Sequence, residues 1–305
     1  MATIVETNFF GNFEQAEDPR VMVIPIPYEY TSSYIKGSKN GPQAILNGSK
    51  RLEKFDDELW LDTSSIGINT SHFVIPEFVH DKSKQPFFEV EQAVRNAVVN
   101  GCMPVIIGGE HSITIGSLKA LYDLYPDISI LHFGARCNLK QISNENKYSS
   151  SCTLKRINEL MPEIKMSFVG VRTISFEEAE WLETTNPNVE IYFARDKNKW
   201  NIADVLTNLT KNVYISFDFN VLDSGIMPCT SYPEPGGFTF EQTCEIIKNI
   251  SAFKEIVGMD FVEFAPQGNL QAPEFLAAKL IYKSIGYSFA RQLGAFEEES
   301  ELAVK

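Results

Sequence analysis

The chain has 305 residues and a formal net charge of −13, with a pI near 4.9. This acidity argues against nucleic acid or an anionic membrane surface as a partner, because both favour patches of lysine and arginine. The five cysteines are scattered and include no C-x-x-C pair, which argues against a disulfide framework and a structural zinc site. We therefore expect a reduced, cytoplasmic protein.

Seven short apolar runs, rich in valine and isoleucine, alternate with helical patterns along the chain. Such runs are typical of strands buried on both faces of a sheet, and their alternation with helices predicts right-handed crossovers and a parallel sheet. The predicted strands are 21–26, 104–108, 128–133, 166–171, 189–194, 213–219 and 256–264. The predicted helices are 41–52, 88–100, 111–124, 151–160, 176–183, 201–210, 239–251 and 273–292.

These elements predict a single three-layer α/β/α domain over residues 1–305, because no repeat, linker or change of composition divides the chain. Residues 1–20 lack the basic and apolar regions of a signal peptide and form a predicted N-terminal extension. The acidic stretch 296–305 is predicted to be a frayed tail. No apolar run approaches the length of about 18 residues that a membrane span needs.

Candidate site residues stand directly after the apolar runs, because ligands of a parallel α/β sheet bind beyond the carboxyl ends of its strands. The segments in these places are G-G-E-H-S (108–112), G-A-R-C-N (134–138), D-F-N-V-L-D (218–223) and V-E-F-A-P-Q-G-N (262–269). The chain contains no G-x-G-x-x-G, H-E-x-x-H or G-x-S-x-G motif, which argues against a dinucleotide-binding protein, a zincin and a serine hydrolase of that type.

Together these segments resemble the ureohydrolase superfamily of arginase, agmatinase and formiminoglutamase, from about residue 20 to residue 292. G-G-E-H-S is similar to that family's G-G-[DE]-H-S motif, S-F-D-F-N-V-L-D to its S-x-D-x-D-x-x-D signature, M-D-F-V-E-F-A-P to its D-x-V-E-x-x-P strand and N-K-Y-S-S-S to its Y-S-H loop. The resemblance implies an arginase-like fold with a central, mostly parallel sheet of about eight strands. It also implies hydrolysis of the C–N bonds of linear amidines such as guanidinium compounds, by a hydroxide that two Mn²⁺ ions generate from water. Trimers or hexamers are the assemblies that it implies.

Most of the metal ligands that the resemblance implies are replaced in this chain. His111 and Asp218 match two of the six ligand positions. Residues that cannot supply the family's carboxylates or imidazole stand at the other four, which are Gly134, Arg136, Asn138 and Asn220.

Three further positions concern proton transfer and substrate binding. Ser150 matches the family's proton-shuttle histidine, and a serine cannot carry a proton near pH 7. Glu263 matches the glutamate that holds the guanidinium substrate, so it is the candidate substrate-binding residue. Asn269 replaces an aspartate that the family has further along the chain.

These replacements change the charge of the site. Four aspartates in the family offer four negative charges to two cations, whereas His111, Asp218 and Asn220 offer one. Two manganese ions would leave buried charge without a partner, which costs several kcal/mol per ion. We therefore expect no manganese cluster, and we hypothesise that the guanidinium of Arg136 replaces it as the counterion of Asp218, Glu263 or both.

Four neighbouring residues have simpler structural interpretations. His132 is predicted to be a hydrogen-bonded core histidine, and Cys137 a small buried hydrophobe. Asp223 is predicted to tie the loop that follows its strand, and Arg172 to make a structural ion pair.

The preferred hypothesis is a catalytically silent homologue with a binding, regulatory or assembly role, as a homo-oligomer or with an active paralogue, and without a cofactor. The alternative is a hydrolase of an agmatine-like or other guanidino compound that uses Mn²⁺ in a reduced, single-metal site of His111, Asp218 and Asn220. Metal-free hydrolysis by Cys137 or Cys229 is a third possibility, for which the sequence positions no base.

Overall fold

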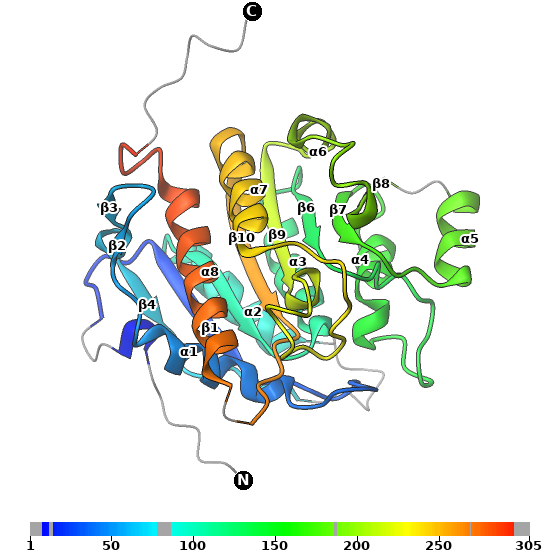
Figure 1. Cartoon of the computed structure of the whole chain (residues 1–305), viewed down its shortest axis with the longest axis horizontal. Coiled ribbons are helices and arrows are strands. Elements are labelled where there is room, and N and C mark those ends of the chain that lie inside the picture. Colours follow the sequence, from blue (N-terminus) through cyan, green and yellow to red (C-terminus); the bar gives the residue numbers. More distant parts are fainter. Residues whose placement is uncertain (1–7, 12–14, 78–86, 186–187, 269, 296–305) are drawn as a thin grey trace, which may run out of the picture.

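An eight-stranded parallel sheet forms the middle layer of the protein (Figure 1). The structure, a computed structural model, describes residues 8–11, 15–77, 87–185, 188–268 and 270–295. The strands lie in the order β4-β1-β5-β10-β9-β6-β7-β8, and each neighbouring pair is parallel. Their bounds are β1 Val21–Ile26, β4 Ile68–Thr70, β5 Met103–Gly108, β6 Ser129–Phe133, β7 Lys165–Val171, β8 Val189–Phe193, β9 Asn212–Asp218 and β10 Glu255–Val262.

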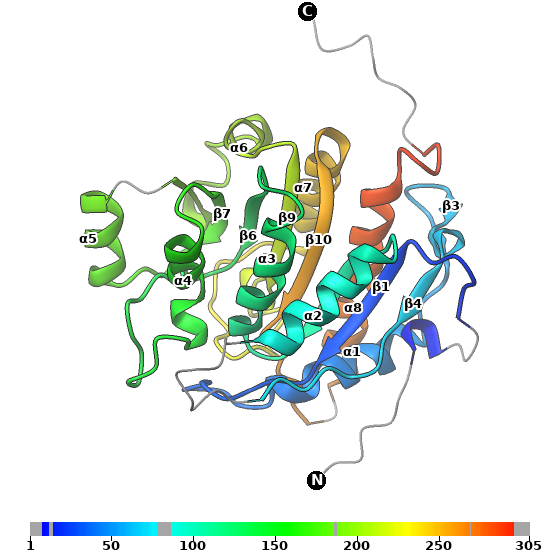
Figure 2. The same cartoon turned by 180° about the vertical axis from the view of Figure 1, so that it is seen from behind.

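Helices cover both faces of this sheet. α1, α7 and α8 lie on the face seen in Figure 1, and α2, α3 and α4 lie on the face seen in Figure 2. Val105 and Ile107 of β5 belong to one hydrophobic core and Ile106 to the other, because alternate side chains of a strand point to opposite faces. This arrangement confirms the predicted three-layer fold. The bounds are α1 Gly41–Ser49, α2 Phe88–Val99, α3 Thr114–Tyr122, α4 Thr153–Leu160, α5 Phe176–Thr185, α6 Ile202–Asn208, α7 Phe240–Phe253 and α8 Gln271–Phe289.

The predicted strands and helices are all present, with ends that differ by a few residues. The apolar pattern did not predict the edge strand β4, nor the hairpin of β2 (Phe55–Asp56) and β3 (Leu61–Asp62). Strands of two or three residues are too short to show a period of alternating side chains.

The two chain ends lie partly or wholly outside the described residues. The predicted tail 296–305 and residues 1–7 and 12–14 of the predicted extension belong to these parts, so the single-domain organisation stays a prediction. Within the described ranges, no helix has both the length and the hydropathy needed to cross a membrane.

Candidate functional site

The candidate site lies where four neighbouring central strands end. In the order of the sheet these strands are β5, β10, β9 and β6. The predicted site residues follow or end them: His111 after β5, Glu263 after β10, Asp218 at the end of β9 and Gly134 after β6. A cavity of about 50 Å³ opens at this place. It is lined by Ser33, Arg136, Asn138, Lys140, Ser143, Ser149, Ser150, Ser151, Asp218, Asn220, Tyr232 and Glu263.

His111 is fully buried and is held from both sides of its ring. The amide nitrogen Nδ2 of Asn138 lies 2.9 Å from its Nδ1, and the hydroxyl of Ser216 lies 2.9 Å from its Nε2. Burial acts to lower the pKa of His111, but the hydrogen bond and charge of Asp218, with the charges of Asp260 and Glu263, raise it above its ordinary value.

Asp218 is enclosed by Asn220, the residue two positions further on. The backbone N–H of Asn220 donates to Oδ1 of Asp218 at 2.9 Å, and the side-chain Nδ2 donates to Oδ2 at 2.8 Å. The other side of the Asn220 amide, Oδ1, accepts from the N–H of Ala135 at 2.8 Å. Asn220 therefore ties the end of β9 to the loop after β6, and the Asp218 carboxylate accepts bonds from the protein's own donors.

A row of polar side chains runs across the sheet beneath His111. Asp260 of β10 pairs in register with Ser216 of β9, which pairs in register with His132 of β6. Ser216 donates to Oδ1 of Asp260 at 3.0 Å, and Tyr214 donates to Oδ2 at 2.7 Å. Burial raises the pKa of Asp260, against the charge of His111 and these hydrogen bonds.

Gly134 leaves room for the ring of His132. A Cβ at position 134 would lie 2.3 Å from Nε2 of His132, a distance that such atoms do not adopt. Nε2 of His132 is 3.1 Å from the carbonyl oxygen of Arg136, and burial lowers the pKa of this histidine to about 3. His132 is a neutral core histidine, as predicted, and its ring also takes the space that a longer side chain at 134 would need.

Arg136 does not pair with Asp218 or Glu263, so the expected counterion role is wrong. Its Nη1 lies 3.1 Å from Oε1 of Glu234, and its guanidinium lies 4.5 Å from the ring centre of Tyr232. The side chain keeps 25% of its surface exposed, so it stays at the mouth of the cavity and partly hydrated. The physical reason is that a guanidinium loses less hydration there, while the Asp218 carboxylate already has donors from Asn220.

Glu263 lies at the floor of the cavity in a left-handed backbone conformation, with φ of 66°. Its Oε1 accepts from the backbone N–H of His111 at 2.8 Å. Burial, followed by the negative charge of Asp218, raises the pKa of Glu263 above its ordinary value. This shift disfavours the charged carboxylate that would bind a guanidinium.

Ser150 lines the cavity, at the place predicted for it. Its backbone N–H donates to the hydroxyl of Thr31 at 3.1 Å, which ties its loop to the segment after β1. Asn269 lies outside the described residues.

Three residues with simpler interpretations have structural roles. Cys137 is fully buried, and burial raises the pKa of its thiol, so it is poorly suited to act as a nucleophile. Asp223 accepts from the N–H groups of Gly225 at 2.9 Å and Gly236 at 2.7 Å, which ties the loop as predicted. Arg172 does not make the predicted ion pair within the described part of the chain. Its half-buried guanidinium donates instead to the backbone carbonyls of Gly170, Asn220, Glu234 and Pro235, which lie within hydrogen-bond distance.

The donor set does not fit two manganese ions. Mn²⁺ prefers oxygen ligands, carboxylates above all. Among the described residues, no three His, Cys, Asp or Glu side chains are grouped so that they could hold a metal ion. His111 and Asp218, the two predicted ligands, each have an amide nitrogen within hydrogen-bond distance, at 2.9 Å and 2.8 Å.

Ser216, Asp260, Glu234 and Lys140 are site residues to which the sequence interpretation gave no role. Ser216 stands two positions before Asp218, so strand alternation could have placed both side chains on one face. Asp260 could have been suspected as a carboxylate inside an apolar strand. No local signal marked Glu234 or Lys140, since both lie in loops whose path the pattern does not define.

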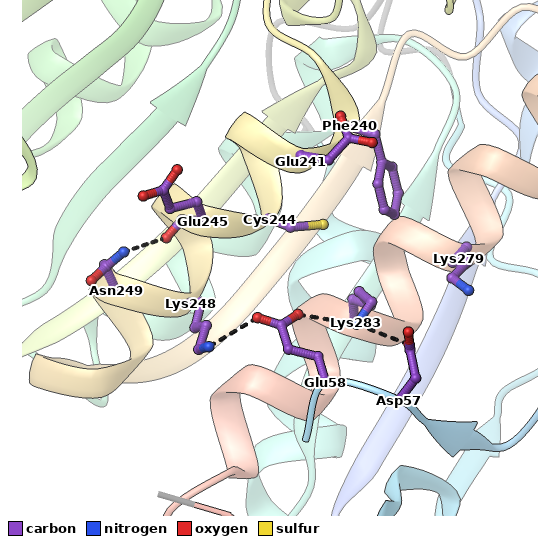
Figure 3. A pocket seen from close by; sticks show the side chains of 10 residues that line it. All are labelled: Asp57, Glu58, Phe240, Glu241, Cys244, Glu245, Lys248, Asn249, Lys279 and Lys283. Carbon is purple, nitrogen blue, oxygen red and sulfur yellow. Dashed lines mark hydrogen bonds and ion pairs between the residues drawn. The ribbon is translucent and has the colours of Figure 1, made fainter. Parts of the chain in front are cut away.

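A second, larger pocket of about 670 Å³ lies between α7, α8 and the β2–β3 hairpin, away from the strand ends (Figure 3). Glu58 is its central group and accepts from Lys248 at 2.9 Å, Lys283 at 3.1 Å and Tyr287 at 2.5 Å. Burial acts to raise the pKa of Glu58, but these hydrogen bonds outweigh it and lower the pKa to about 2. The network ties the hairpin to both helices, and none of the predicted site residues lines this pocket.

Known proteins resemble this chain over most of its length. The N(1)-aminopropylagmatine ureohydrolase of Synechocystis sp. is 30% identical over 283 residues, covering 88% of this chain and 89% of the relative. The protein of that name from Thermus thermophilus is 31% identical over 273 residues, covering 88% and 90%. The crystal structure of the agmatine ureohydrolase of Thermoplasma volcanium superposes with a TM-score of 0.79 at 28% identity, covering 91% of this chain and 92% of that one. A sequence model described as "Arginase family" matches residues 19–286, and the chain therefore belongs to the arginase family.

Proposed function

We propose that this chain is a member of the arginase family that binds a ligand or a protein partner without hydrolysing guanidino compounds. One observation carries the proposal: the amide nitrogen of Asn138 lies 2.9 Å from Nδ1 of His111, and the amide nitrogen of Asn220 donates to Oδ2 of Asp218 over 2.8 Å. A metal ion needs those same atoms as lone-pair donors, so the amides compete with it for the two family ligands that remain.

Charge supports the same conclusion. Within the ligand positions Asp218 carries one negative charge, and Arg136 adds a permanent positive charge at the mouth of the cavity. Two divalent ions would therefore lie in a buried place without compensating charge, which is strongly unfavourable. Ser150, at the position of the proton-shuttle histidine, offers no group that exchanges a proton near neutral pH.

A binding or assembly role would be exercised in a cytoplasmic oligomer, either of identical chains or with an active paralogue. This part of the proposal rests on the family, whose members are typically trimers or hexamers, and on no contact of this chain.

The second candidate is hydrolysis of an agmatine-like guanidino compound, and the names of the relatives favour it over the first. Relatives about 30% identical along almost the whole chain are named as ureohydrolases of N(1)-aminopropylagmatine. A single Mn²⁺ held by His111, Asp218 and the amide oxygen of Asn220 would be its cofactor, and the amide of Asn220 would first have to release both Asp218 and Ala135.

Metal content and turnover separate the two candidates. The purified chain is incubated with excess Mn²⁺, desalted and analysed for metal, and urea release is measured with agmatine, arginine and N(1)-aminopropylagmatine. Neither bound metal nor urea is the expected result. Near-stoichiometric Mn²⁺ together with urea release would refute the proposal and establish the hydrolase.

A further inference from the structure

The cavity at the strand ends is lined by cations and hydroxyl groups more than by free carboxylates. Arg136 and Lys140 are its two cationic side chains. Its hydroxyl groups belong to Ser33, Ser143, Ser149, Ser150, Ser151 and Tyr232.

The two carboxylates at the floor are already engaged by the protein. Both oxygens of Asp218 accept from Asn220, and Oδ2 also lies 3.6 Å from Nδ1 of His111. Oε1 of Glu263 accepts from the N–H of His111 at 2.8 Å. Internal donors therefore already use part of the accepting capacity of both carboxylates, which leaves less of it for a cationic ligand such as a guanidinium.

Hydrogen-bond donors around the mouth have capacity left for a ligand. Nη1 of Arg136 is used by Glu234, whereas its Nε and Nη2 donate to none of the described residues. Lys140 has no carboxylate within ion-pair distance in the described ranges, and the hydroxyls of Ser143 and Ser150 have no hydrogen-bond partner there. The unused groups are thus two charged side chains that can only donate and two hydroxyls that can donate or accept.

The size of the cavity limits what can enter. A buried water needs roughly 10–15 Å³ of such volume, so about 50 Å³ has room for a few water molecules or one compact group. Several donors that line one compact space match the oxygens of a carboxylate or phosphate, which accept several hydrogen bonds at once.

We propose that this cavity binds a compact oxyanion, a carboxylate or a phosphate group, through Lys140, the free donors of Arg136 and the hydroxyl of Ser150. The inference rests on the proposed function, since a site for guanidinium hydrolysis has to accept a cation at the same place. The ligand of this chain is therefore opposite in charge to a guanidinium.

Calorimetric titration of the full chain tests the proposal. Inorganic phosphate and sodium acetate are titrated at constant ionic strength, with sodium chloride as the reference salt. Lys140→Met removes the unpaired cation, Ser150→Ala removes the hydroxyl, and Lys147→Met is the matched control. Lys147 is a lysine of the same loop that lies over the ring of Tyr148 and does not line the cavity.

Saturable binding of phosphate or of acetate is expected, and the tighter of the two identifies the kind of oxyanion. Removal of a charged hydrogen-bond donor weakens binding by roughly tenfold or more, so Lys140→Met should lose affinity to this extent. Ser150→Ala should lose less affinity. Lys147→Met should bind the anion within about twofold of the unaltered chain. Absence of saturable binding, or an equal loss in Lys147→Met, overturns the proposal. The metal and urea assay tests the proposed function independently, because anion binding can fail in a silent protein.

Discussion

Replacement of Asn220 by aspartate tests whether an amide has taken the place of a metal ion at the strand ends. In the unaltered chain, Nδ2 of Asn220 donates to Oδ2 of Asp218 over 2.8 Å, and both side chains are buried. Asn220→Asp keeps the shape of the side chain and exchanges this donor for a second carboxylate. Two buried carboxylates then face each other at hydrogen-bond distance.

The expected loss of stability is large. A hydrogen bond to a charged group contributes about 1.5–3 kcal/mol. Leaving a buried charge without its partner raises the total cost to about 3–5 kcal/mol. At about 2 °C per kcal/mol for a large domain, the unfolding temperature of Asn220→Asp should fall by roughly 6–10 °C.

Thermal unfolding followed by circular dichroism, with and without excess Mn²⁺, measures the effect. Asn212→Asp is the matched control, because Asn212 lies at the other end of β9 and donates to Asp127 at 2.7 Å from an exposed position. Screening by water limits its cost to about 1 kcal/mol or less.

Mn²⁺ should restore part of the stability of Asn220→Asp, since the new carboxylate at position 220 then forms a group of three ligands with Asp218 and His111. The same ion should leave the stability of the unaltered chain unchanged. Unfolding of Asn220→Asp at the original temperature in the absence of metal would refute the reasoning. An equal rise in the unfolding temperature of the unaltered chain on addition of Mn²⁺ would refute it as well.

Three further predictions concern neighbouring contacts. Arg136→Gln should destabilise the chain by less than about 1 kcal/mol in urea unfolding, because its pair with Glu234 is partly exposed; a loss of several kcal/mol would reveal a buried partner. Gly134→Ala should destabilise the chain by about 1–3 kcal/mol, because the new Cβ clashes with His132. His132→Ala removes the clashing ring, so the double variant should lose less stability than the sum of the two single losses in a double-mutant cycle. Additive losses would contradict the clash. The pKa of Glu58 is lowered to about 2, so its contribution to the stability of the fold is present above its ordinary pKa and is lost as pH falls from about 4.5 towards 2. Curves of stability against pH for the unaltered chain and for Glu58→Gln should therefore converge at low pH. Parallel curves would show that the ionised Glu58 does not stabilise the fold.

Much of the fold could be predicted from the sequence because its signals are local. The run V-M-V-I-P-I predicts β1 with the observed bounds, since a strand buried on both faces must be apolar at every position. β4 and the β2–β3 hairpin escaped prediction because two or three residues carry no period, and pairing with distant partners creates them.

The sequence by itself determined which chemical groups stand near the strand ends: amides at 138 and 220, a glycine at 134 and a serine at 150. Only the tertiary structure decided which groups these side chains bind. Arg136 pairs with Glu234, almost a hundred residues away in the chain, instead of Asp218. The Asp218 carboxylate accepts hydrogen bonds from Asn220 rather than from an arginine. Residue types define charge and hydrogen-bonding capacity. The choice among partners depends on the path of the loops and on the hydration that each group keeps. Neither of these two factors produces a periodic pattern in the sequence.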